Sequence, residues 1–258
     1  MKLITIPFSH FCEKGRWALD LTGIPYDEVR IAPVIQRLVV MPLGSLTVPV
    51  LIDGRHVTSE SNEILRLCDQ RFPADEKLFP ADPDLRAEVE QLVERFDTVT
   101  APNVRLWFYA WATADPEKLR EYGQHGLPPG QRRIMKAALP VISKMLSAHF
   151  EIESGTHERA AEIVTGELEF VGDLLADGRP YLVGDHFTAA DLAFCAFVGN
   201  SLGAPGYGGP GFTPPPGPAE LAPQVLQWAQ LPVAAWVHGV YAQHRMAKPG
   251  LRSLQFAL

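Results

Sequence analysis

The sequence predicts an α/β domain followed by an all-helical domain. Over about the first 72 residues, short β-rich runs alternate with helical patterns, and a proline-rich acidic stretch follows at residues 72–84. From residue 85 onward, apolar residues recur at helical spacing. We therefore place an α/β domain at residues 1–74, a linker at 75–84 and an all-helical domain at 85–258.

The first half of the α/β domain has the order strand, helix, strand, helix. KLITI at residues 2–6 is a β-rich run, and apolar residues at helical spacing predict a helix over 13–22 that stops at a glycine. Residues 26–31 can form a second strand, and a weaker helical pattern covers 33–41.

The second half of this domain predicts a hairpin and a helix. VPVLID and RHVT flank the Asp53-Gly54 dipeptide, whose two residues both tolerate a positive φ and so favour a tight hairpin turn. An amphipathic helix then ends near Phe72. The predicted order of the whole domain is βαβαββα.

The remainder of the chain predicts helices with one long loop. Helical patterns cover residues 85–114, 131–150, 158–176, 188–198 and 220–247. Residues 203–218 are too rich in glycine and proline for regular structure, so we expect either a lid or a simple insertion there. Thr188 and Asp191 have the spacing of a capping box at the start of a buried helix.

Composition and charge exclude several classes of protein. The hydrophobic fraction of 47% and the charged fraction of 21% are typical of globular proteins. A net charge of -7, with lysine and arginine scattered along the chain, is unfavourable for nucleic-acid binding. No apolar run is long enough to span a membrane, and the opening MKLITIPF has too short an apolar core for a secretory signal, so we expect a cytoplasmic protein. Cys12, Cys68 and Cys195 are too widely spaced for a disulfide framework or a metal site, and we expect reduced thiols.

Four stretches together resemble the cytosolic-type glutathione S-transferases of bacteria. They are SHFCEKGRWAL after the first strand, TVPVL at the third strand, SES before the third helix, and GDHFTAADLAF in the helical domain. The resemblance implies a thioredoxin-like first domain, glutathione as co-substrate, and a homodimer. It also implies detoxification chemistry, in which the glutathione thiolate is conjugated to a small apolar electrophile. Related peroxidase, isomerase or dehalogenase chemistry is possible on the same scaffold, and a non-catalytic ligand- or protein-binding module is the alternative.

The resemblance assigns glutathione to two short segments. Val48-Pro49 corresponds to a cis-proline pair, whose valine backbone would bind the cysteinyl part of the tripeptide as an edge strand would. Glu60 and Ser61 open a helix, where free N–H groups favour a carboxylate. Ser61 would bind the γ-glutamyl carboxylate, and Glu60 would bind the ammonium group.

The thiol is predicted to lie at the start of the first helix. No tyrosine precedes Tyr26, so the resemblance is to the serine- or cysteine-type members and not to the tyrosine type. Ser9 is the first candidate for activating the thiol, because its hydroxyl can donate to a thiolate. Cys12, which could form a mixed disulfide, and His10, which could act as a base, are the other candidates.

Two further expectations concern the rest of the ligands. Many family members have a basic residue where this chain has Thr47, so Arg37 or His56 would have to bind the glycyl carboxylate. The electrophile would lie between the two domains. The residues predicted to line its site are Phe11, Trp107 and Trp111, with Phe8, Phe108 and Tyr207 as further candidates.

Overall fold

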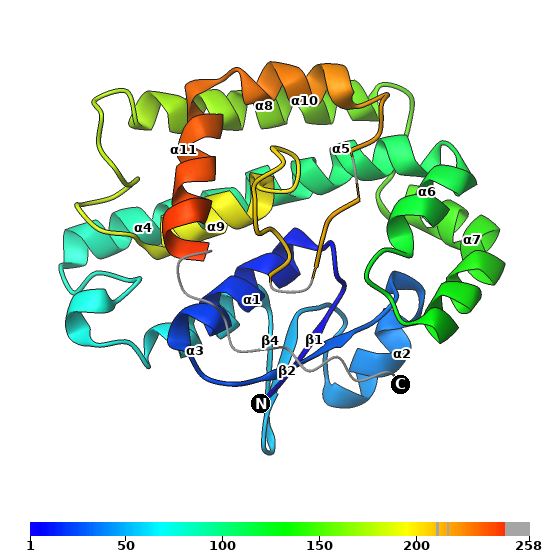
Figure 1. The fold of residues 1–258 in the computed structure, drawn as a ribbon, viewed down its shortest axis with the longest axis horizontal. Coiled ribbons are helices and arrows are strands. Elements are labelled where there is room, and N and C mark those ends of the chain that lie inside the picture. Colours follow the sequence, from blue (N-terminus) through cyan, green and yellow to red (C-terminus); the bar gives the residue numbers. More distant parts are fainter. Residues whose placement is uncertain (210–211, 216, 246–258) are drawn as a thin grey trace.

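The N-terminal part contains a small mixed sheet with a thioredoxin-like arrangement (Figure 1). The structure is a computed structural model, and it describes residues 1–209, 212–215 and 217–245. The strands are β1 (Lys2–Thr5), β2 (Asp27–Arg30), β3 (Val50–Asp53) and β4 (His56–Ser59), in the spatial order β2-β1-β3-β4. β1 is parallel to β2 and antiparallel to β3, and β3 is antiparallel to β4. The predicted fold class is confirmed.

Helices cover the sheet as the alternation of its side chains requires. The helical segments of this part are α1 (His10–Thr22), η1 (Pro33–Ile35), α2 (Gln36–Val40), η2 (Met41–Leu43) and α3 (Ser61–Asp69). Leu3 and Leu51 point to one face and join the main core with α1 and α3. Ile4 and Val50 point to the other face and form a second cluster with Val40 of α2. A period of two along each strand therefore places apolar side chains on both faces.

The predicted hairpin and helix starts are close to those observed. Asp53 pairs with His56 across a turn in which Gly54 has φ 61°, a conformation that suits glycine. α1 begins three residues earlier than its apolar pattern indicates, because Ser9 caps it. The third helix ends at Asp69 and not near Phe72.

The described residues of the C-terminal part form helices joined by loops, with no strand. Its elements are α4 (Pro83–Arg95), the π-helical turn η4 (Phe96–Thr100), α5 (Ala101–Thr113), α6 (Pro116–Gly123), α7 (Pro129–His149), α8 (Thr156–Leu174), α9 (Ala189–Val198), α10 (Ala222–Ala229), α11 (Pro232–Val240) and the π-helical turn η5 (Tyr241–Arg245). The sequence analysis missed α6, which is short and polar. No helix among the described residues is long and apolar enough to cross a membrane.

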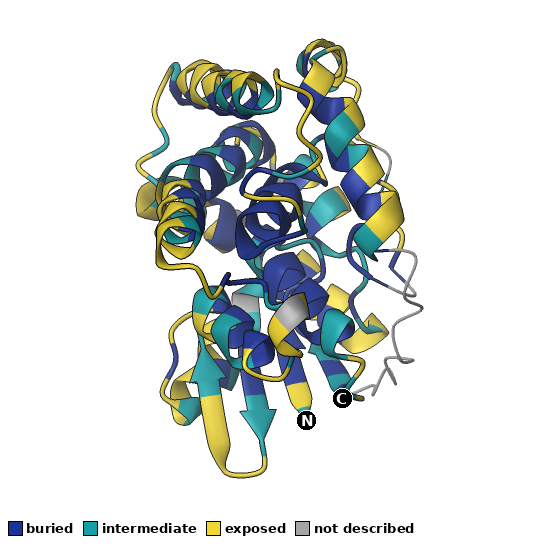
Figure 2. Cartoon of the chain, turned by 90° about the vertical axis from the view of Figure 1, so that its left-hand side faces the viewer, coloured by how far each residue is buried: buried dark blue, intermediate teal, exposed yellow. Residues whose placement is uncertain are grey.

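Helix α9 lies at the centre of the molecule, and all ten of its residues are buried (Figure 2). The predicted capping box starts it, since the Thr188 N–H donates to Asp191 at 2.8 Å. Asp191 also accepts from the Leu182 N–H at 2.8 Å. α9 packs against α1 of the N-terminal part and against α4, so one continuous core joins the two parts. The short turn η3 (Ala74–Glu76) lies in the proposed linker, and the exact domain limits remain a prediction.

Candidate functional site

Three segments of the predicted glutathione site meet at Gly15 in α1. A Cβ atom at this position would lie 3.1 Å from Pro49 Cγ and 3.7 Å from Ile64 Cδ1 of α3. The absence of a side chain therefore lets α1 approach both the Val48-Pro49 segment and α3. The Val48-Pro49 bond is cis, as predicted. Val48 itself lies two residues before the first ladder pair of β3.

Glu60 has an unusual backbone conformation immediately before α3. Its φ is 71° and its ψ is 129°, which is rare for a residue other than glycine. Such conformations cost of the order of 1–3 kcal/mol and occur preferentially at functional sites. The side chain is exposed and accepts a hydrogen bond from Thr47 Oγ1 at 2.8 Å. Ser61, the first residue of α3, is only 5% exposed.

A buried ionic cluster that the sequence analysis missed lies beside this helix start. The Lys14 ammonium donates to Asn62 Oδ1 at 2.5 Å and to Asp97 Oδ1 at 2.6 Å, and Asn62 Nδ2 donates to Asp97. Burial lowers the pKa of Lys14, while the charges of Asp97 and Glu60 oppose that shift. The signal in the sequence is a lysine one turn before Ala18 on the apolar face of the first helix.

Ser9 is the N-cap of α1. Its Oγ accepts from the Cys12 N–H at 3.4 Å, and its own N–H donates to the Ile6 carbonyl at 3.1 Å. The side chain is half-buried, and its hydroxyl hydrogen can still donate to a group placed at the helix start. The helix N-terminus itself favours negative charge at this point.

Cys12 and His10 are buried beside Ser9. Cys12 is fully buried and its Sγ accepts from the Ile6 N–H at 3.4 Å. Burial raises the pKa of Cys12 to about 11, so it is a neutral thiol at pH 7. The His10 pKa is lowered to about 3, first by burial and then by the charges of Arg105 and Lys14. His10 is therefore neutral at pH 7 and a weak proton acceptor there.

The predicted electrophile-site residues are divided between two places. Phe8 and Phe11 are half-buried at the start of α1, and the buried Tyr207 reaches them by donating its hydroxyl to the Phe8 carbonyl at 3.0 Å. Trp107 packs within the helical part, with ring centroids 4.7 Å from Trp228 and 5.7 Å from His157.

The remaining candidates lie deeper in the helical part or on the surface. Trp111 and Phe108, both of α5, pack on one another at 5.6 Å between ring centroids. Arg37 and His56, the candidates for the glycyl carboxylate, are both exposed.

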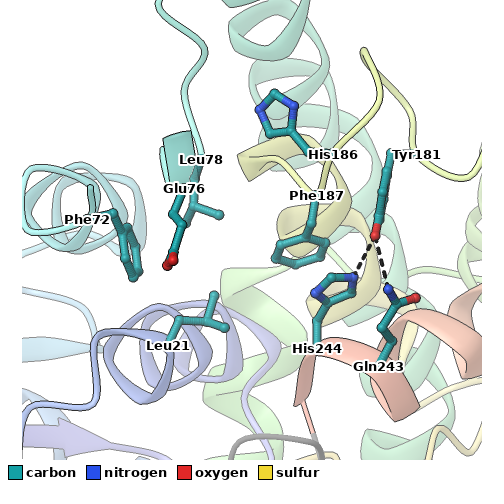
Figure 3. A pocket seen from close by; sticks show the side chains of 9 residues that line it. All are labelled: Leu21, Phe72, Glu76, Leu78, Tyr181, His186, Phe187, Gln243 and His244. Carbon is teal, nitrogen blue, oxygen red and sulfur yellow. Dashed lines mark hydrogen bonds between the residues drawn. The ribbon is translucent and has the colours of Figure 1, made fainter. Parts of the chain in front are cut away.

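A cavity of about 280 Å³ lies away from these residues (Figure 3). It opens between α1, the linker and the segment before α9, with Leu21, Phe187 and Tyr181 among its walls. His244 stacks on Phe187 at 4.2 Å and bonds the Tyr181 hydroxyl at 3.0 Å. None of the predicted site residues lines this cavity.

The fold is that of the glutathione S-transferases. Residues 3–76 match the family model for the glutathione S-transferase N-terminal domain, and this match contains Ser9, Val48-Pro49 and Glu60-Ser61. No curated protein sequence matches the chain.

Solved bacterial structures have the same fold over almost the whole chain. A glutathione S-transferase from Xanthobacter autotrophicus has a TM-score of 0.60 at 20% identity, covering 97% of this chain and 95% of that one. One from Methylobacterium radiotolerans, in complex with glutathione sulfonate, has a TM-score of 0.60 at 22% identity, covering 100% and 98%. One from Methylobacillus flagellatus, with glutathione bound, has a TM-score of 0.58 at 20% identity, covering 94% of each chain.

Proposed function

We propose that this protein is a glutathione transferase that conjugates the glutathione thiolate to small electrophiles. The observation that carries the proposal is the conformation of Glu60, which has φ 71° directly before the buried Ser61 at the start of α3. The helix N-terminus favours a carboxylate, and the exposed Glu60 carboxylate beside it can pair with an ammonium group. The γ-glutamyl end of glutathione carries this pair of groups.

The rest of the tripeptide fits the neighbouring segments. The backbone at Val48 precedes the ladder pairs of β3, and there its N–H and C=O could pair with an extended peptide as a neighbouring strand would. The Lys14 cluster supports the proposal, because it holds α1 and α3 together beneath Glu60 and Ser61. The two bacterial structures solved with glutathione or glutathione sulfonate are consistent with the same ligand.

We assign activation of the thiol to Ser9. Its hydroxyl is half-buried at the N-terminus of α1 and can donate to a thiolate, which the helix dipole also favours. Cys12 is a weaker candidate, because burial raises its pKa to about 11 and leaves little thiolate at pH 7. His10, with a pKa near 3, is a weaker candidate as a base.

Calorimetric titration with glutathione tests the proposal. We expect saturable heat that Ser61→Ala weakens by about tenfold or more, because the variant removes a hydrogen bond to a charged group. Ser154→Ala is the matched control, since it removes an exposed hydroxyl elsewhere. Absence of heat at millimolar glutathione in the wild-type protein would contradict the proposal and favour the non-catalytic binding module.

A homodimer is part of this proposal. The resemblance places the contact on the first domain and the long helix that follows the linker, here α4. Light scattering should give twice the chain mass of 28.4 kDa. A monomer at micromolar concentration would refute this assignment without affecting glutathione binding.

A further inference from the structure

Arg105 in α5 is a half-buried cation that no carboxylate balances. Among the residues that the structure describes, it makes no ion pair and no hydrogen bond, and its Nε atom is buried without a partner. The buried Arg16 and Arg245, in contrast, each contact a carboxylate within 3 Å. Burial lowers the pKa of Arg105. Removing a guanidinium from water without giving it a partner costs free energy. Binding an anion beside it would offset part of this desolvation cost.

Two aromatic rings lie beside the Arg105 guanidinium. Its Cζ lies 5.7 Å from the ring centroid of Phe11 and 4.8 Å from that of Phe150. Tyr109, one turn further along α5, stacks on Phe150 at 5.1 Å. These rings form an apolar surface beside a positive charge, which suits a ligand with a flat apolar body and one anionic group.

A second unpartnered polar group belongs to the same cluster. His10 is 9% exposed, and its buried Nε2 atom has no hydrogen-bond partner within the described part of the chain. Its ring lies 4.8 Å from the Phe11 ring, and Arg105 is the charged group with the largest influence on it. The neutral imidazole can donate or accept one hydrogen bond. Lys14, the other cation near His10, is already balanced by Asp97.

The cluster is directly connected to the proposed thiol site. His10 and Phe11 are the two residues that follow Ser9 in the chain, while Arg105 comes from the helical part. An electrophile held by Arg105 would therefore lie near the start of α1, where we place the sulfur. The glycyl carboxylate of glutathione is a less suitable occupant, because the peptide is assigned to the backbone at Val48.

We infer that the second substrate carries a carboxylate or an equivalent oxyanion, which Arg105 binds beside the rings of Phe11 and Phe150. This inference rests on the proposed transferase function and specifies its substrate class as apolar or aromatic acids. Arginine is suited to this role, because its planar fork can bind both oxygens of a carboxylate.

A pair of matched electrophiles tests the inference. 4-Chloro-3-nitrobenzoate and its methyl ester both react by substitution: sulfur bonds to the ring carbon, chloride leaves with the bonding electrons, and the thiol proton passes to solvent. Each kcat/KM is divided by the uncatalysed rate constant of the same compound with glutathione. We expect the wild-type protein to prefer the acid by about tenfold or more, as a charge-assisted bond implies.

Two variants distinguish the effect of Arg105 on kcat/KM from a general effect of removing a positive charge. Arg105→Met should lower kcat/KM for the acid by about 10- to 100-fold and change the ester by less than about threefold. Arg133→Met, which removes an exposed arginine of α7, is the control and should change neither. If Arg105→Met does not fold, the acid-to-ester ratio of the wild-type protein alone decides. Equal normalised rates for the two compounds would overturn the inference.

Binding of an unreactive acid gives a readout independent of turnover. Calorimetry with 3-nitrobenzoate should show binding to the wild-type protein that Arg105→Met abolishes and Arg133→Met preserves. If glutathione binds but 3-nitrobenzoate binding does not depend on Arg105, the inference is wrong and the proposed function stands. If 3-nitrobenzoate binds through Arg105 but glutathione gives no heat, the transferase proposal fails and the anion site remains.

Discussion

The Lys14 ammonium in α1 lies 2.6 Å from the Asp97 carboxylate in η4, and this ion pair joins the N-terminal part to the helical part. The lysine side chain is fully buried, and that of the aspartate is 12% exposed. Asn62 of α3 contacts both partners. Through Asn62, the pair therefore couples the start of α3, directly after the proposed glutamyl site, to the packing of the two parts.

Removing Asp97 should strongly destabilise the protein. Asp97→Ala leaves the Lys14 charge buried without its partner, and such losses typically cost about 3–5 kcal/mol. Urea unfolding measures the change. Glu90→Ala is the control, because it breaks only exposed pairs, with Arg66 and with Arg86, each of which should cost at most about 1 kcal/mol. Similar losses for the two variants would show that the buried pair contributes little.

Ser9→Ala should impair catalysis far more than Cys12→Ala. Loss of one hydrogen-bond donor to a developing or stabilised anion lowers kcat by the order of 10²-fold. The pH–rate profile of Ser9→Ala should also shift to higher pH, because the bound thiol would ionise less readily. Steady-state kinetics between pH 5.5 and about 9 would measure both effects. The opposite ranking of the two variants would transfer the role to Cys12.

The cysteine thiols should be unreactive in the folded protein. Burial raises the pKa of Cys12 to about 11 and that of Cys68 to about 12, and it also raises the pKa of Cys195. Because the thiolate is the reactive form, a disulfide reagent at pH 7.5 should label the native chain very slowly. In denaturant it should label all three cysteines. Rapid labelling of one native thiol would indicate an exposed, activated cysteine.

His10 should make the protein less stable in acid. The unfolded chain takes up a proton near the usual pKa of 6.5, whereas the folded chain does so only near a pKa of about 3. The contribution of His10 to the free energy of unfolding is therefore fully present above pH 6.5 and is lost as the pH falls towards 3. The loss between pH 8 and pH 5 amounts to about 2 kcal/mol.

Comparison with His10→Phe tests whether the loss of stability in acid originates from His10. The substitution keeps an aromatic ring against Phe11 and Phe197 but removes the titrating group. Urea unfolding at both pH values should show a smaller difference in this variant. An unchanged difference would assign the acid sensitivity to other groups.

Glu60→Gly should separate stability from ligand binding. Glycine adopts a positive φ without strain, so the variant should unfold at the same or a higher temperature, despite the greater flexibility of glycine in the unfolded chain. Glutathione affinity should fall, because the proposed ammonium contact is lost. Thermal unfolding and calorimetry measure the two effects. A large loss of stability would mean that the bond from Thr47 to Glu60 outweighs the strain.

Local patterns in the sequence were sufficient to predict the sheet and most helices. The hairpin near Asp53-Gly54 and the capping box of Thr188 and Asp191 depend on neighbours in the chain, and both are confirmed. The turn itself is shifted by one residue, because Asp53 pairs within β3 and the turn residues are Gly54 and Arg55. The cis bond before Pro49 came from the family resemblance and not from residue chemistry. The short polar helix α6 was missed, since it has little apolar periodicity.

Contacts between distant segments could not be predicted in this way. Asp97 lies 83 positions from Lys14, and neither residue type nor spacing indicates that they pair. The environment of Arg105 likewise depends on Phe11 and Phe150, which come from different elements. Trp107 was predicted to line the electrophile site, but it packs on Trp228 within the helical part. A helical pattern of aromatic residues does not show which face of the helix meets the core.

The described residues 203–209 of the glycine- and proline-rich loop are anchored to the start of α1. The Tyr207 hydroxyl donates a hydrogen bond to the Phe8 carbonyl, and the Gly208 N–H donates to the buried Glu13 carboxylate at 3.1 Å. A Cβ atom at Gly208 would lie 2.0 Å from a Phe212 ring carbon, so no other residue fits there without rearrangement. Insertions or deletions between 203 and 208 would thus be transmitted mechanically to the residue that precedes Ser9. Selection on catalysis would therefore constrain the length of residues 203–208, although a glycine- and proline-rich composition alone suggests that this length could vary.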